Sequence, residues 1–105
     1  MKSNELYKHL QTLDLPLAYH HFEEGHSPKP PFMVYYYPDS SNFGADNIAY
    51  HKGLSVVLEV YTDKKDLDLE ARVEDFLDRH SFYFDKVETY IAPEKLYQEA
   101  YYFEL

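Results

Sequence analysis

Hydrophobic residues near the start of the chain recur at the spacing of one helix face. Leu6, Leu10 and Leu13 lie three and four residues apart. This spacing predicts a first helix over residues 4–13, with Ser3 as its N-cap.

A second helical pattern, longer and more regular, lies in the middle of the chain. It predicts a helix that begins after Asp63 or Asp66 and ends at about Arg79. Its polar face is rich in acidic residues, including Glu70 and Glu74, which we expect to be solvated. The apolar stripe consists of Leu69, Val73, Phe76, Leu77 and His80.

Other segments alternate between apolar and polar residues or are rich in aromatic and β-branched residues, as strands are. Residues 23–31 contain one glycine and three prolines, and they indicate a loop. Residues 48–52 and 54–62 form either two strands or one long bent strand, with Gly53 as a turn or a bulge. The predicted strands are residues 17–22, 32–37, 48–52 and 54–62, followed by a final hairpin of 82–91 and 96–105.

The order is therefore helix, several strands, helix and hairpin. A chain of 105 residues has the length of one domain, here residues 1–105. We expect an α+β fold in which two α-helices pack on one face of a mostly antiparallel β-sheet.

Composition and charge narrow the classes of function. Ten basic and nineteen acidic residues give a net charge of −9, which argues against nucleic-acid binding by bulk charge and against docking on an anionic membrane. The absence of cysteine excludes disulfides and thiolate chemistry. No apolar run approaches the roughly 20 residues of a membrane span, and the first residues do not resemble a signal peptide. We expect folding in a cytoplasm.

Aromatic residues are unusually frequent. Twelve tyrosines and seven phenylalanines make up 18% of the chain, more than the core of a small domain requires. One interpretation is a two-faced sheet whose hydroxyls lie in water. The other, which we favour, is an oligomer or assembly surface, because tyrosine is enriched in protein interfaces.

The sequence contains no recognisable motif of a metal site, a phosphate-binding loop or a catalytic site. His20 and His21 are expected on a strand, where neighbours point to opposite faces, so they should not share a metal ion. A cluster of His20, Glu23 and His26 matches no zinc spacing. Three glycines provide no phosphate-binding loop. Lys64 and Lys65 indicate a solvated turn. We expect no enzymatic activity, no cofactor and no metal site.

Five short motifs, together with Tyr50, carry a resemblance that extends over residues 14–105. The motifs are residues 31–38 (PFMVYYYP), 42–46 (NFGAD), 60–66 (VYTDKKD), 88–91 (ETYI) and 94–98 (EKLYQ). As a set they resemble the small tail-terminator, or tail-completion, proteins of siphophages and prophages of Gram-positive bacteria.

The resemblance implies a structural virion protein of the lambda terminator type, with an α+β subunit. Such subunits close into a hexameric ring on the tail tube, end tube growth and present a surface to the filled head. The implied partners are other copies of the chain, the major tail tube protein and head–tail connector proteins. DNA would pass through the acidic lumen without specific binding, because carboxylates repel phosphate. The implied location is the virion, after assembly in the bacterial cytoplasm. From turn position and strand alternation, the candidate contact residues are Tyr35, Tyr36, Tyr37, Asn42, Phe43, Asp46, Tyr50 and Tyr97.

Two alternatives remain open at this point. One is a head–tail connector or stopper protein of the neck. The other, from a different class, is a small acidic regulatory or host-directed binding protein whose aromatic residues would form one patch.

Overall fold

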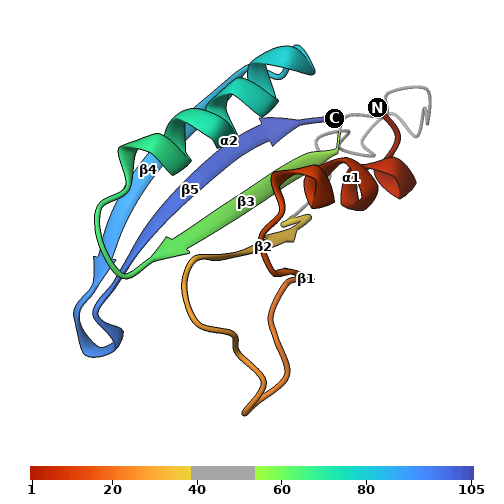
Figure 1. Ribbon diagram of the computed structural model, residues 1–105. Coiled ribbons are helices and arrows are strands. Elements are labelled where there is room, and N and C mark those ends of the chain that lie inside the picture. The colour runs from red at the N-terminus through yellow and green to blue at the C-terminus, as the bar shows by residue number, and fades with distance from the viewer. Residues whose placement is uncertain (39–53) are drawn as a thin grey trace.

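The strands alternate apolar and polar residues and each helix has one apolar stripe, so the chain folds into a sheet with helices packed on one face, as predicted. The computed structural model describes residues 1–38 and 54–105 (Figure 1). Among these residues, no helix is long and apolar enough to cross a membrane. The elements in chain order are α1 (Ser3–Leu10), the short 3₁₀ helix η1 (Gln11–Leu13), β1 (Leu17–Tyr19), β2 (Phe32–Tyr36), β3 (Ser55–Thr62), α2 (Leu67–Arg79), β4 (Phe84–Ile91), the 3₁₀ helix η3 (Ala92–Glu94) and β5 (Leu96–Glu104).

The five strands form one sheet in the order β1-β2-β3-β5-β4. β1 and β2 are parallel, and every other neighbouring pair is antiparallel. The predicted final hairpin is confirmed: β4 and β5 pair along their length around η3, where Lys95 has a φ of 55°. The fold is α+β with a mixed, mostly antiparallel sheet and two helices.

Both helices cover the same face of the sheet (Figure 1). Val56, Leu58 and Val60 of β3 are each at most 1% exposed and point toward this layer. Because side chains alternate along a strand, Val57 and Glu59 of β3 point to the opposite face. No helix among residues 1–38 and 54–105 covers that face, which we call the helix-free face. The core that joins the layers consists of Leu6, Leu10, Leu13, Met33, Tyr35, Val56, Leu58, Val60, Leu69, Val73, Phe76, Leu77, Tyr101 and Phe103.

The two helices begin in different ways. Asp66 is the N-cap of α2, and its carboxylate accepts a hydrogen bond from the Leu69 amide at 3.0 Å. The prediction that Ser3 caps α1 was wrong, because Ser3 is already helical. The N-cap is Lys2, whose backbone amide donates a hydrogen bond to Glu5 Oε1 at 2.9 Å. A side chain from the first turn of α1 therefore provides the acceptor for the amide of the N-cap residue.

Two strands end earlier than predicted. The first strand ends at Tyr19 and does not reach residue 22, because His20 has a φ of 70° and turns the chain out of the sheet. The strand predicted over 32–37 ends at Tyr36. The strand predicted over residues 48–52 lies outside the described residues.

The choice of cap for α2 can be tested directly. Replacing Asp66 with alanine removes the acceptor of the Leu69 amide and should lower the free energy of unfolding by about 1 kcal/mol. The control Asp63→Ala should change it by less than about 0.5 kcal/mol. Urea unfolding measures both values, and equal losses would contradict the assignment.

Candidate functional site

Half of the predicted contact residues lie within the described part of the chain. Tyr35 is 6% exposed and belongs to the core, whereas Tyr36, Tyr37 and Tyr97 are half-buried. Their roles in partner contacts stay predictions. The other four, Asn42, Phe43, Asp46 and Tyr50, lie outside the described residues.

Three of these tyrosines separate onto the two faces of the sheet. On the helix side, the rings of Tyr35 and Tyr37 pack with Tyr19, at centroid distances of 5.2 Å and 5.6 Å. The Tyr37 hydroxyl donates to the Ser3 carbonyl, which joins the residue after β2 to the first residue of α1. Burial raises the pKa of both Tyr35 and Tyr37. These rings therefore stabilise the subunit itself.

Tyr36 lies on the helix-free face, in a network around one carboxylate. Glu59 accepts hydrogen bonds from Tyr36 at 3.1 Å and Tyr61 at 2.7 Å, and the amide of Gln98 donates to the Tyr61 hydroxyl. Burial and the neighbouring Glu59 charge raise the pKa of Tyr36 to about 12. The phenols therefore stay protonated and act as donors at neutral pH.

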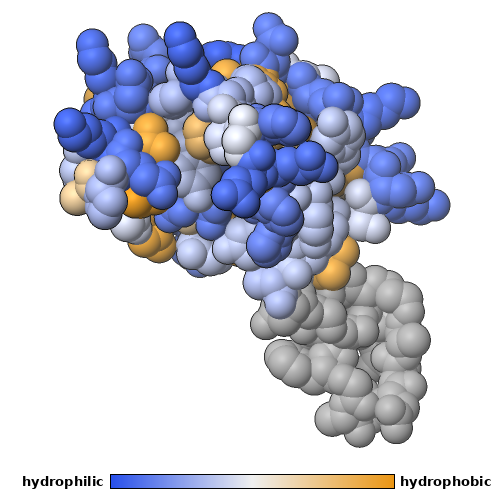
Figure 2. Space-filling model, turned by 90° about the horizontal axis from the view of Figure 1, so that it is seen from below, coloured by the Kyte–Doolittle hydropathy of each residue, from blue (hydrophilic) through white to orange (hydrophobic). Residues whose placement is uncertain are grey.

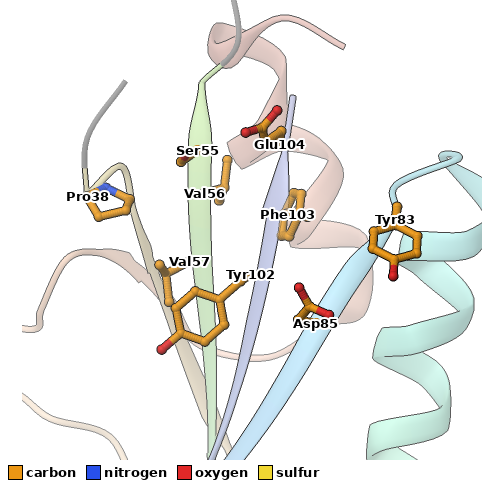
Figure 3. A pocket seen from close by; sticks show the side chains of 9 residues that line it. All are labelled: Pro38, Ser55, Val56, Val57, Tyr83, Asp85, Tyr102, Phe103 and Glu104. Carbon is orange, nitrogen blue, oxygen red and sulfur yellow. The ribbon is translucent and has the colours of Figure 1, made fainter. Parts of the chain in front are cut away.

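The same face opens into a shallow cleft of about 570 Å³ near one end of the sheet. Figure 3 shows Tyr102 of β5 between Val57 of β3 and Asp85 of β4. The described residues that line the cleft bring the carboxylates of Asp85 and Glu104 beside aromatic and apolar surface, and they include no histidine. Such a lining suits contact with another molecule.

The most concentrated group of charges lies on the helix side, between α2 and the β4–β5 hairpin. The ammonium of Lys65 lies among the carboxylates of Glu70, Glu88 and Glu99, at 2.7 Å, 2.5 Å and 3.3 Å. Glu70 and Glu99 are 5% and 1% exposed. One cation therefore connects α2, β4 and β5.

A second lysine extends this network. Lys86 of β4 lies 2.9 Å from Glu70 and 2.7 Å from Glu74, both on α2. The hydroxyl of the buried Tyr101 donates to Glu74 at 3.0 Å. Most of the carboxylate oxygens are thus satisfied, but Glu99 Oε1 is buried without a hydrogen-bond partner.

The carboxylates of this network differ in their proton affinity. Burial, the hydrogen bond that protonated Glu99 can donate to Glu88, and the charge of Glu70 raise the pKa of Glu99 to about 7. Burial also opposes ionisation of Glu70, but hydrogen bonds from Lys65 and Lys86 outweigh it and lower the pKa of Glu70. Hydrogen bonds to Glu70 and Glu88 raise the pKa of Lys65. Lys65 is therefore the fixed charge, and Glu99 is the group that titrates near neutrality.

Carboxylates in this arrangement are of the kind that holds a divalent cation, since one oxygen from each of Glu70, Glu88 and Glu99 lies within 4.8 Å of the others. The Lys65 ammonium already fills that role, with donors directed at all three groups. We assign this cluster to the architecture of the subunit.

The sequence interpretation missed this network. Glu70 was expected on a solvated face, and that prediction was wrong because Glu70 is buried. Lys65 is exposed, as expected of a solvated turn, but it also pairs with Glu70. The alternation along β5 contained a usable signal. Glu99 shares its parity with Tyr101 and Phe103, which places it on the helix side of the sheet.

The histidine argument also needs correction. His20 and His21 were expected to point to opposite faces of a strand, but both follow β1, and their Nδ1 atoms lie 3.0 Å apart. Both side chains are exposed. The positive φ of His20 breaks the alternation on which the prediction depended.

Much of the remaining surface is hydrophilic. Seen from below, the molecule shows hydrophobic residues only in small, separate patches between polar side chains (Figure 2). Exposed aromatic residues that the sequence interpretation did not single out include Tyr83 at 86%, Tyr90 at 51% and Tyr102 at 44%.

The role of Lys65 can be separated from that of its neighbour. Lys65→Met leaves Glu70 and Glu99 buried without their shared cation. We expect it to lower the free energy of unfolding by about 1 to 2 kcal/mol, because the ammonium is partly exposed to water. The matched control Lys64→Met, at an exposed position, should change it by less than about 0.5 kcal/mol. Chemical denaturation of both variants tests this, and similar values would contradict the network's role.

The raised pKa of Glu99 predicts a specific pH dependence. The folded protein binds this proton more tightly than the unfolded chain, so the stabilisation is complete below about pH 4.5 and is lost as pH rises through about 7. Each unit of difference in pKa corresponds to about 1.4 kcal/mol. Relative to Glu99→Gln, the wild type should therefore lose stability between about pH 5 and about pH 8. Denaturation at both pH values measures the two free energies of unfolding. If wild type and Glu99→Gln differ by the same amount at both pH values, this assignment is refuted.

Comparisons of this chain with family models, with curated proteins and with solved structures find no match.

Proposed function

We propose that this protein is a structural subunit of a phage head–tail junction. In this proposal it acts as a tail terminator: it associates with copies of itself into a ring, ends growth of the tail tube and presents a surface for the head. The proposal includes no catalytic step and no cofactor. It rests on the motif set of residues 14–105 and on the surface described above.

The observation that carries the proposal is the number of exposed apolar side chains on and beside the β4 edge of the sheet, where they lie on both of its faces. Of the eight large hydrophobic side chains exposed among residues 1–38 and 54–105, four lie on β4, directly before it or on the adjoining β5. They are Tyr83, Val87, Tyr90 and Tyr102. Tyrosines that remain half in water on a stable sheet are typical of surfaces that contact other proteins.

The charge of the chain supports the same function. A net charge of −9 suits a subunit beside a passage for DNA, because an acidic wall repels phosphate. The implied partners are the major tail tube protein on one side and connector proteins on the other. We keep two alternatives, a connector or stopper of the neck and a small acidic binding protein directed at the host.

Deletion of the reading frame from the phage or prophage that carries it separates these functions. Loss of a terminator should give tails of uncontrolled length together with filled, tailless heads, seen by electron microscopy. Loss of a connector should give tails of normal length and heads that lose their DNA. Normal particles would refute both virion functions and favour the host-directed protein.

Complementation with variants tests the surface itself. Tyr102→Ser removes an exposed ring from the helix-free face, and loss of such an anchor costs an interface about 2 kcal/mol. We expect this variant to fold but to restore few joined particles. Tyr7→Ser, at an exposed position on α1, is the control and should restore them. Equal complementation by both variants would place the contact surface elsewhere.

A further inference from the structure

β4 is the last strand of the sheet, and among the described residues nothing pairs with its outer edge. The strand has eight residues, Phe84–Ile91, and lies along one side of the molecule (Figure 1). An unpaired edge of this length presents a row of amide and carbonyl groups to which another strand can bind.

The side chains of this edge include two exposed apolar groups. Val87 and Tyr90 are each 51% exposed. A lysine on an edge strand usually prevents pairing, because a neighbouring strand would bury its charge. Here the ammonium of Lys86 lies 2.9 Å from Glu70 and 2.7 Å from Glu74 of its own subunit, which lowers the cost of placing another strand beside it. The middle of the edge is therefore Val87 between two residues of opposite charge, Lys86 and Glu88.

We propose that β4 pairs antiparallel with β4 of a second copy of this chain, around a two-fold axis that passes beside Val87. In this register each Val87 lies opposite the other, and each Lys86 lies opposite Glu88 of the second copy. Phe84 then lies opposite Tyr90. Paired residues come from the same face of their sheets, so the two five-stranded sheets join into one with all helices on one side.

The charges of β4 select this register over its neighbours. A two-fold axis perpendicular to the sheet must place one residue opposite its own copy. Lys86 and Glu88 have partners of opposite charge within the subunit, Glu70 and Glu74 for Lys86 and Lys65 for Glu88. Centring the pair on Lys86 or on Glu88 would still place two like charges opposite each other, which is less favourable than an opposite-charge pair. Centring it on Val87 replaces these contacts with two opposite-charge pairs and an apolar contact. The inference concerns the free protein and does not rest on the proposed function.

Light scattering of the purified full chain tests the pairing. The wild type should be a dimer. Val87→Asp and Val87→Lys, each placing like charges at the axis, should weaken dimerisation by about tenfold or more. An equimolar mixture of the two variants should restore a dimer containing one of each. The control Tyr7→Lys, which introduces a charge on α1, should dimerise as the wild type does. Circular dichroism checks that every variant is folded.

The absence of cysteine from the chain allows a second test that fixes the register. Under mild oxidation, Val87→Cys should cross-link to itself. Asp85→Cys and Thr89→Cys, which lie opposite each other in the proposed pair, should cross-link only when mixed. A monomeric wild type, a ring that persists in the Val87 variants, or cross-links in another pattern would each overturn the proposal. None of these results depends on the phenotype of the deleted gene.

Discussion

The ammonium of Lys65 joins three parts of the fold that are distant in sequence. It lies directly before α2, and its carboxylate partners come from α2, β4 and β5. With Lys86 and Tyr101, this network attaches the acidic side of α2 to the outer two strands of the sheet. The apolar stripe of α2 does not by itself select one position on the sheet. Directional hydrogen bonds in this network, in which Glu70 and Glu99 are buried, favour one position along β4 and β5.

α1 and α2 lie on one face of the sheet, and no helix in the described part of the chain covers the other. Val34, Val57 and Ala100 are nevertheless buried on that other face. Their cover comes in part from large neighbouring side chains, among which Tyr36 and Tyr61 are held in place by Glu59. A face built in this way is ordered but still presents rings and hydroxyls to water. This combination of rigidity and partial exposure is favourable for contact with another protein, since little side-chain entropy remains to be lost.

The abundance of tyrosine thus has more than one cause. Tyr101 and Tyr35 fill the core, Tyr36 and Tyr61 stabilise the helix-free face, and Tyr83 is almost fully exposed. A count of aromatic residues mixes these three groups. Only the exposed group bears on assembly, and among the described residues much of it gathers near the open β4 edge.

The sequence by itself determined the fold class and most of the elements. Period-two and period-3.6 patterns are local properties of the chain, so they identified both helices, the strand after Gly53 and the final hairpin. They were less successful at strand ends, where the left-handed backbone of His20 stopped β1 early. The pairing of Lys65 with Glu70, Glu88 and Glu99 was decided only by the tertiary structure. A charged residue in a sequence is solvated by default, and its burial depends on which distant element packs over it. The same holds for the tyrosines. Alternation along a strand assigns each ring to one of the two faces of the sheet, but the position of the helices decides which face becomes core.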